Sequence, residues 1–396
     1  MLKFFVVVFF IAVFGSIIFI LIKALGPNKN RTGGNGGDSS RDRNKETDAL
    51  CRTLTPEELY ENACKLVKEN GTKSDYYRWE NFMSTAAKKG YIPAVREWGI
   101  YNANKNNDFA LDLLTKAADA DDGKAVEELF RLYYYGSYGG VPKIEKDRDK
   151  AVSIIKPYAE KGNAVAQRLL GNYYYYEKDS NKKALEWYLK AADGGDAEAM
   201  VQAADIYSYK EDFEAQEKLL LKAAEQDYED AEFNLGVFYQ TFERDDETYD
   251  FEKAMYWYKR AFGHGGDLAA CYVGEMYLNG EGVPKDEYQA FEWFKKSFEA
   301  GSIVGTYHYG KCYMEGIGVE QDKKEGIRLY TKAAEYVSDA QYALGLCYLE
   351  GNGVKKDLKT AVDYLKKAAH DRMPNEEAQD KLEELYSSGE IDKDEL

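Results

Sequence analysis

The chain has 396 residues, of which 44% are hydrophobic and 31% charged, a composition typical of a globular protein. The first 31 residues carry four basic side chains and no acid, so the net charge of −17 leaves the remainder at −21, which repels phosphate backbones and excludes nucleic acids as expected partners. Five cysteines and three histidines exclude a disulfide scaffold and a histidine-rich metal centre, and no cofactor is expected.

The N-terminus predicts a membrane segment. Residues 4–22 contain no charged side chain, and about twenty apolar residues span a bilayer, whereas the apolar part of a signal peptide usually has about 7–15. The sequence that follows, Lys23-Ala24-Leu25-Gly26, is a poor cleavage site. We therefore predict a single transmembrane anchor over residues 1–25, with a signal sequence as the alternative. The basic flanks do not decide on which side of the membrane the body lies.

The next segment, residues 26–50, is rich in Gly, Asn, Ser and charge, and residues 26–48 contain no hydrophobic side chain. Without apolar surface to bury, nothing offsets the entropy of ordering, so we predict a disordered linker. A capping hairpin is expected over residues 51–90. Its first helix should begin at Thr55-Pro56-Glu57-Glu58, a capping box with proline at the first helical position.

From about residue 54 the chain repeats. A pair of mostly small residues recurs at spacings of 31 to 41 residues: Ala86-Ala87, Ala117-Ala118, Tyr158-Ala159, Ala191-Ala192, Ala223-Ala224, Ala261-Phe262, Ser297-Phe298, Ala333-Ala334 and Ala368-Ala369. A period near 36 residues predicts one helical hairpin per repeat. The expected fold is therefore all-α: a right-handed αα-superhelical solenoid of about nine helix-turn-helix repeats, with the array over residues 91–371 and a capping helix and acidic tail over 372–396.

The last three repeats show the unit most clearly. Each has a glycine inside its first helix, at Gly274, Gly310 or Gly345. A glycine loop that can adopt positive φ then ends the first helix, and Asp286, Asp322 or Asp357 is suited to cap the second. Small residues should let neighbouring helices approach closely. Large residues should fill the space between hairpins, among them Trp187, Tyr188, Trp257, Tyr258, Trp293 and Phe294.

This pattern resembles the Sel-one-like repeat family, which is related to the tetratricopeptide repeats. The residues that carry the resemblance in one repeat are Ala164, Ala166, Leu170, Gly171, Tyr174, Ala184, Trp187, Tyr188, Lys190, Ala191 and Ala192. The resemblance is strong over residues 163–370 and weaker over 82–162. It implies a scaffold or adaptor that binds proteins, as in endoplasmic-reticulum quality control or the bacterial envelope. One bacterial branch has a disulfide in every repeat, and this chain lacks that cysteine pattern.

A row of side chains on the first helices is the candidate binding site. With 100° per residue, three positions around each repeat glycine should lie opposite the core, and these positions are rich in aromatic and aliphatic groups. We expect a groove for a protein or peptide; the alternative is that these side chains pack on the adjacent repeat. The predicted contacts are Arg168, Asn172, Gln202, Phe233, Asn234, Tyr272, Glu275, Tyr307, His308, Lys311, Tyr342 and Leu346.

No catalytic or metal-binding residues are predicted. His264, His308 and His370 lie in three different repeats, with no nucleophile at a defined spacing. The chain is therefore predicted not to be an enzyme, and an envelope hydrolase is kept only as a remote alternative. Cys312 and Cys347 share one repeat position and are expected to be core thiols. Cys51 and Cys64 are candidates for a disulfide in an oxidising compartment.

The predicted function is a membrane-tethered scaffold that binds an unidentified protein or peptide partner, with residues 4–22 as its membrane contact. The last four residues, Lys393-Asp394-Glu395-Leu396, are the endoplasmic-reticulum retrieval signal if the source is a eukaryote. They favour an alternative, a lumenal quality-control adaptor.

Overall fold

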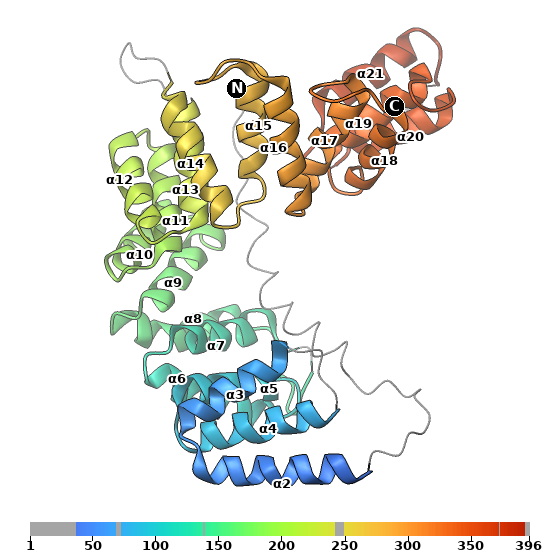
Figure 1. The fold of residues 1–396 in the computed structure, drawn as a ribbon. Helices are drawn as coiled ribbons and strands as arrows, with labels where there is room; N and C mark the ends of the chain where they lie inside the picture. Colours follow the sequence, from blue (N-terminus) through green and yellow to red (C-terminus); the bar gives the residue numbers. More distant parts are fainter. Residues whose placement is uncertain (1–36, 69–72, 138, 242–248, 372, 393–396) are drawn as a thin grey trace. The chain divides into compact units, whose positions relative to one another are not determined.

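The computed structural model describes residues 37–68, 73–137, 139–241, 249–371 and 373–392. Twenty helices lie within these ranges, and none of the described residues is in a strand. The chain divides into two compact units, Met1–Gly194 and Gly195–Leu396. Each unit is a stack of antiparallel helix pairs, as Figure 1 shows. The all-helical repeat solenoid expected from the sequence is confirmed, whereas the handedness of its superhelix stays a prediction.

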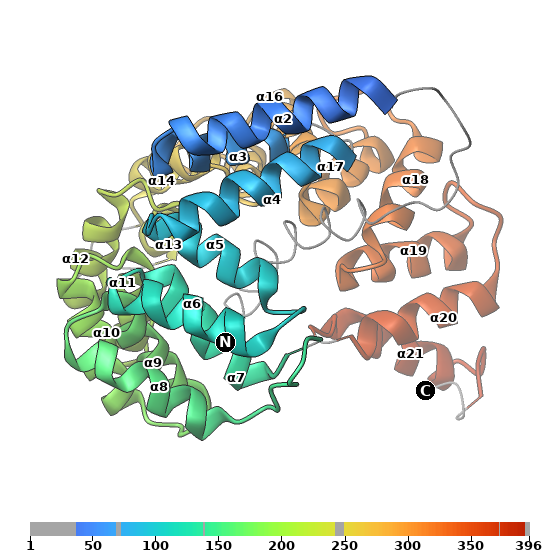
Figure 2. The same cartoon turned by 90° about the horizontal axis from the view of Figure 1, so that it is seen from below.

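The first unit begins with α2, which lies along α4, and continues as four hairpins in which each helix packs mainly on the next (Figure 2). Its helices are α2 (Gly37–Thr53), α3 (Pro56–Lys68), α4 (Lys73–Lys88), α5 (Ile92–Asn102), α6 (Asn107–Asp119), α7 (Gly123–Tyr135), α8 (Arg148–Glu160), α9 (Ala164–Tyr176) and α10 (Asn181–Asp193).

The second unit contains five hairpins and a final helix packed on α20. Its helices are α11 (Ala197–Tyr209), α12 (Phe213–Ala224), α13 (Glu229–Thr241), α14 (Phe251–Gly263), α15 (Ala269–Asn279), α16 (Glu287–Glu299), α17 (Ile303–Glu315), α18 (Lys323–Ala333), α19 (Ser338–Glu350), α20 (Leu358–Ala369) and α21 (Glu376–Ser387). The last of these lies where the sequence predicts a capping helix, and its Ala378, Leu382 and Leu385 are buried.

The nine hairpins of the described residues, α3/α4 to α19/α20, match the nine residue pairs of the sequence repeat. Each pair lies at the end of the second helix of its hairpin, and the first member of the pair is completely buried at Ala86, Ala117, Ala191, Ala223 and Ala261. A small side chain at this point lets the following hairpin pack closely on the one before it.

The predicted helix ends are confirmed. Gly280, Gly316 and Gly351 take left-handed conformations with φ of 79°, 78° and 79° and end α15, α17 and α19. Asp286 begins α16 by accepting a hydrogen bond from the amide of Gln289 at 3.0 Å, and Asp322 and Asp357 begin α18 and α20 in the same way. Thr55 and Glu58 form the expected reciprocal capping box at α3.

In six of the nine hairpins of the described residues, a glycine within the first helix makes room for a large side chain of the second helix. A Cβ added to Gly171 or Gly236 would lie closer than 3.0 Å to ring carbons of Tyr188 or Tyr258, nearer than real Cβ atoms approach. The same holds for Gly274, where the side chain is Phe294. Tyr188, Tyr258 and Phe294 are at most 1% exposed, so this close packing forms the centre of their three hairpins.

The prediction of a disordered linker through residue 50 is wrong in part, because α2 runs from Gly37 to Thr53. Leu50 and Cys51 near its end, with Leu54 just beyond it, pack against the core of the first unit. This apolar end anchors a helix whose charged residues alone give no reason for order. Residues 4–22, the predicted membrane anchor, lie outside the described residues. Among the described helices, none has both the length and the apolar character needed to cross a bilayer.

We expect Gly236→Ala to destabilise the second unit by about 1 kcal/mol. Alanine is intrinsically the better helix former by about 1 kcal/mol, but overpacking against Tyr258 costs about 1–3 kcal/mol and should prevail. Urea unfolding measures the change. Gly263→Ala is the matched control, because nothing lies within 4 Å of a Cβ at Gly263. Equal shifts of the two variants would contradict the packing role of Gly236.

Candidate functional site

The two predicted contacts in the first unit, Arg168 and Asn172 of α9, serve packing within that unit. Arg168 is only 6% exposed, and its guanidinium lies 3.8 Å from a carboxylate oxygen of Glu127 on α7. Asn172 accepts a hydrogen bond of 2.7 Å from the hydroxyl of the buried Tyr188. Arg168 is therefore buried and does not lie on an open face, contrary to the prediction. Asn172 is half-buried and makes a structural contact within its hairpin.

The other ten predicted contacts lie on the first helices of the second unit, and all are half-buried. We call this surface the row face: Gln202 of α11; Phe233 and Asn234 of α13; Tyr272 and Glu275 of α15; Tyr307, His308 and Lys311 of α17; Tyr342 and Leu346 of α19. Within the row face, the Phe233 ring meets the edge of Tyr272 with centroids 5.1 Å apart. Tyr307 meets His308 in the same manner, also at 5.1 Å.

The inner sides of these rings stack on the aromatic residues of the second helices. Tyr272 stacks on Tyr258 with centroids 5.0 Å apart, and Tyr307 stacks on Tyr330 at 5.4 Å. His308 stacks on Phe294 at 5.0 Å. The two sequence interpretations, a binding groove and packing on the neighbouring repeat, therefore apply to opposite sides of the same rings, because one side meets the core and the remainder reaches solvent.

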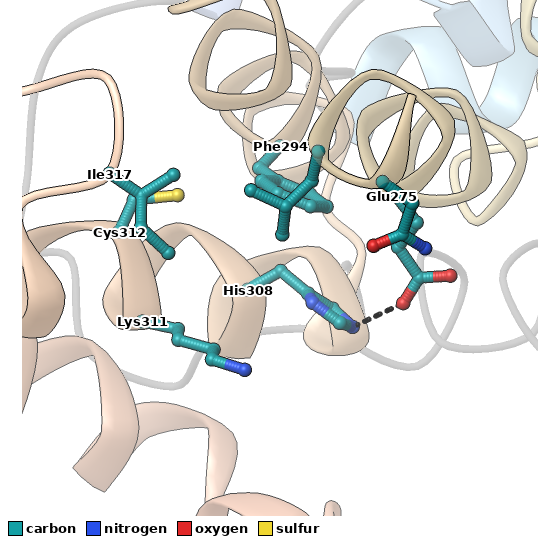
Figure 3. A pocket seen from close by; sticks show the side chains of 8 residues that line it. Glu275, Phe294, His308, Lys311, Cys312 and Ile317 are labelled. Atoms are coloured by element: carbon teal, nitrogen blue, oxygen red, sulfur yellow. Dashed lines mark ion pairs between the residues drawn. The ribbon is translucent and has the colours of Figure 1, made fainter. Parts of the chain in front are cut away.

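A pocket of about 180 Å³ opens between α15, α16 and α17 at the centre of the row face. It is lined by Glu275, Leu278, Asn279, Phe294, His308, Lys311, Cys312 and Ile317. Figure 3 shows the carboxylate of Glu275 facing the imidazole of His308, with the Lys311 side chain along the same side and Cys312 and Ile317 at the other end. The Glu275 Oε1 and His308 Nε2 atoms are 3.6 Å apart.

Burial sets the charges in this pocket. It lowers the pKa of His308 to about 4, with a smaller contribution from the positive charge of Lys311, so the imidazole is neutral at pH 7. Burial also raises the pKa of Glu275 to about 7, and the nearby carboxylate of Glu281 adds to this increase. The pair at 3.6 Å is therefore a neutral ring beside a carboxylate whose negative charge is poorly compensated.

A second poorly compensated carboxylate lies on α11, at Asp205. Burial, together with the carboxylate of Asp230 on α13, raises the pKa of Asp205 to about 7. Burial likewise raises the pKa of Glu229, at the start of α13, to about 7. The face formed by α11, α13 and α15 thus combines aromatic rings with acidic groups. Sequence reasoning missed this property, because a shifted pKa depends on burial and on neighbours in other helices.

One cluster has side chains of the types that bind metals. Asp227, Glu232 and His264 each place a possible ligand atom within 4.8 Å of the others. Arg260, however, already lies among them: its Nη2 is 2.8 Å from Asp227 and its Nε is 2.7 Å from Glu232. Glu232 is completely buried and its carboxylate is also 2.8 Å from Nδ1 of His264. We interpret the cluster as an ionic link between α13 and α14 rather than as a metal site.

The cysteines of the second unit are core thiols, as predicted for Cys312 and Cys347, which are 0% and 5% exposed. Burial raises the pKa of Cys312 to about 12 and that of Cys347 to about 11, so neither is a thiolate at neutral pH. The Cys312 thiol in the pocket is therefore a poor nucleophile. Cys51 and Cys64, left open as a disulfide pair, are not joined by a disulfide in this structure.

Comparison with known proteins places these features in a family. The Sel1 repeat pattern matches residues 95–122, 124–163, 164–196, 229–265, 267–302, 304–335 and 338–371, more than half of the chain. A solved Sel1 repeat protein from Oxalobacter formigenes is 28% identical and has a TM-score of 0.53; the similarity covers 61% of this chain and 97% of that one.

Of two further similar proteins, one matches only a short segment of the chain and the other matches most of it at low identity. HRD3A of Arabidopsis thaliana, an ERAD-associated E3 ubiquitin-protein ligase component, is 34% identical over 74 residues, which are 18% of this chain and 11% of that protein. The present chain therefore matches only about a tenth of the length of this relative. The protective antigen c5321 of uropathogenic Escherichia coli is 21% identical, with 89% of this chain and 91% of that one covered and a TM-score of 0.34.

We expect the contribution of Asp205 to the free energy of unfolding to fall as the pH rises from about 4 to 7. Asp205 has its pKa raised on folding, so the folded state holds a proton that the unfolded state releases, and this stability is lost as the pH passes through about 7. Asp205→Asn should raise the free energy of unfolding at pH 8 by about 1–2 kcal/mol and much less at pH 4.5, since one pKa unit corresponds to about 1.4 kcal/mol and Asp205 keeps some contact with solvent.

Urea unfolding at the two pH values measures this effect. Asp363→Asn, on the exposed side of α20, is the control with the same change of charge. An equal gain from Asp205→Asn at both pH values would show that the carboxylate of Asp205 is not destabilised by burial.

Proposed function

Because this chain belongs to the Sel1 repeat family, we propose that it is a non-enzymatic scaffold that binds a partner polypeptide on the row face of its second unit. A Sel1 repeat solenoid is a helical scaffold suited to binding proteins. The observation that carries the choice of surface is the alignment of half-exposed rings on successive first helices, Phe233, Tyr272 and Tyr307. Aromatic side chains in partly desolvated positions are the usual anchors of protein interfaces.

The rings of the row face are held in place before a partner arrives. Tyr272 and Tyr307 stack on Tyr258 and Tyr330, which are 0% and 4% exposed. A ring fixed in this way has little rotamer freedom left to lose on binding, so more of its contact energy appears as affinity. By contrast, tyrosines elsewhere in the unit extend further into solvent: Tyr256 is 56% exposed and Tyr288 is 58% exposed.

The chemistry of the pocket supports binding rather than catalysis. Its neutral His308 and protonatable Glu275 resemble an acid–base pair, but the thiol that lines the same pocket, Cys312, is fully buried and protonated at neutral pH. A hydrolase needs an activated nucleophile or a held water beside the base. The pocket instead offers a carboxylate and ring surfaces, which are groups that recognise a side chain.

We further propose that residues 4–22 tether this scaffold to a membrane. The support is the sequence alone, an uncharged run of suitable length.

A specific observation favours a second candidate function, an adaptor in endoplasmic-reticulum quality control. The 34% identity to part of HRD3A, whose name describes an ERAD-associated ligase component, supports it. The Lys393–Leu396 sequence is consistent with the same compartment. In this second function the partner on the row face is a protein of the lumen or of its membrane.

A photo-crosslinking amino acid placed at Tyr272, Tyr307 or Tyr342 should capture the same partner from each position. At Tyr256, Tyr288 or Tyr336, which are more exposed but lie off the row face, it should capture little. The full chain, expressed in its source cells and irradiated, is purified and the crosslinked protein is identified by mass spectrometry. Equal capture from both sets, or capture only from the second, would contradict the row face as the binding surface.

The second candidate predicts a change of compartment. In eukaryotic cells, the full chain should co-fractionate with the endoplasmic reticulum, and a variant that lacks Lys393–Leu396 should move towards later secretory compartments or the medium, because a retrieval signal is read by a receptor. Replacing Asp394 and Glu395 with Asn and Gln gives a control of unchanged length that should behave like the deletion. Unchanged localisation of both variants would remove this function.

A further inference from the structure

We propose that the pocket between α15, α16 and α17 receives a lysine or arginine side chain of the partner segment, held by the Glu275 carboxylate and flanked by the rings of the row face. This inference rests on the proposed function and adds to it the chemical class of the partner: a basic segment that also carries apolar or aromatic residues.

The geometry fits one long side chain. The pocket has a volume of about 180 Å³, whereas a single water needs only about 10–15 Å³ on the same measure. Leu278, Phe294 and Ile317 supply apolar walls for an aliphatic stem. Glu275 faces the imidazole of His308 in the same pocket, where its carboxylate can meet the charged end of the side chain (Figure 3). Lysine and arginine place their methylene stems on apolar surface and their charges at polar groups in this way.

The charge of Glu275 has no full counterpart in the protein. The imidazole of His308 lies 3.6 Å from it, and that imidazole is neutral at pH 7 because burial lowers its pKa to about 4. Burial and Glu281 together raise the pKa of Glu275 to about 7, so the positive charge of Lys311 compensates the carboxylate only in part. The Glu275 side chain is 38% exposed, so an incoming cation can reach it.

The surroundings of the pocket are acidic as well. The negative charges of Asp339, Glu315, Glu377 and Glu275 add to the effect of burial in raising the pKa of Tyr307, which lies next to His308. Asp205 and Asp230 extend the negative charge towards α11 and α13. A face with this sign attracts cationic segments and repels acidic ones.

Lys311 is the one cation among the residues that line the pocket, and it defines the opposite possibility, a site for an acidic side chain. Among the described residues, no carboxylate lies within ion-pair distance of its Nζ, and Lys311 is half-buried on α17. Its charge lowers the pKa of Glu275, but burial and Glu281 outweigh it. The balance of charges around Glu275 therefore favours a cation. Lys311 repels that cation, but its flexible side chain can move aside.

The experiment compares two fluorescein-labelled dodecapeptides, three copies of Leu-Lys-Tyr-Lys and three copies of Leu-Glu-Tyr-Glu, with the full chain by fluorescence anisotropy. The salt concentration is about 0.15 M, which screens charges more than about 8 Å apart. We expect the lysine peptide to bind and the glutamate peptide to bind at least tenfold more weakly. Glu275→Gln should weaken the lysine peptide about five- to tenfold, and Lys311→Met should strengthen it about threefold.

Glu252→Gln is the matched control. It removes the same charge from an exposed position on α14 and should change the affinity less than twofold. Thermal unfolding of each variant checks that the second unit is intact, and Lys311→Met tests the inference independently if Glu275→Gln fails to fold.

Two results would overturn the inference. Preference for the glutamate peptide, with loss of binding in Lys311→Met, would assign the pocket to an acidic side chain and leave the row face as the binding surface. Equal effects of Glu275→Gln and Glu252→Gln would show only long-range attraction to an acidic protein. Failure of the proposed function is a separate result, because it appears as crosslinking that does not depend on the row face.

Discussion

The structure depends on one close contact, which recurs in six of the nine hairpins of the described residues, between a glycine of the first helix and a large side chain that the second helix places against it. Gly236 and Tyr258 show it most clearly, since a Cβ on the glycine would collide with the ring. The contact sets the distance between the two helices of a hairpin. A hydrogen bond holds the same ring in place: the hydroxyl of Tyr258 donates to the side-chain oxygen of Gln240 at 2.7 Å. The buried rings of Tyr258, Phe294 and Tyr330 are the platform on which the rings of the row face stack.

The row face, which we propose as the binding surface, and the core are therefore two sides of the same layer of rings. Tyr272 lies on Tyr258, Tyr307 lies on Tyr330 and His308 lies on Phe294. A side chain that stacks on a buried ring can adopt few rotamers, so the side chains of the row face are ordered because they pack on the ordered core. This arrangement explains why half-buried positions, rather than the most exposed tyrosines, form the candidate site.

The acidic groups Asp205 and Glu275 of the second unit oppose stability, and Glu275 is the group that we propose binds a cationic side chain. Asp205 and Glu275 are held where burial raises the pKa of each to about 7, so their ionised forms are destabilised in the free protein. A cationic partner would relieve this cost at Glu275. The Glu232–Arg260–His264 cluster shows the contrasting case, in which a buried carboxylate finds its counterpart within the same unit and links α13 to α14.

The sequence by itself determined the repeat, because periodicity, helix caps and glycine turns are local properties. The nine hairpins, the aspartate caps such as Asp286 and the left-handed glycines such as Gly280 follow from residues a few positions apart. Helical geometry also selected the ten residues of the row face, all of which are half-buried on the first helices of the second unit. Sequence reasoning missed α2, whose order comes from Leu50 and Cys51 packing on the core of its unit.

Only the tertiary structure decided which row residues are accessible and how they are charged. Arg168 turned out to be buried beside Glu127, and Glu232 paired with Arg260, because these contacts join residues 41 and 28 positions apart along the chain. The neutral His308 and the uncompensated Glu275 likewise depend on burial by a neighbouring helix. Burial and charge compensation are properties of packed helices, and a linear pattern does not contain them.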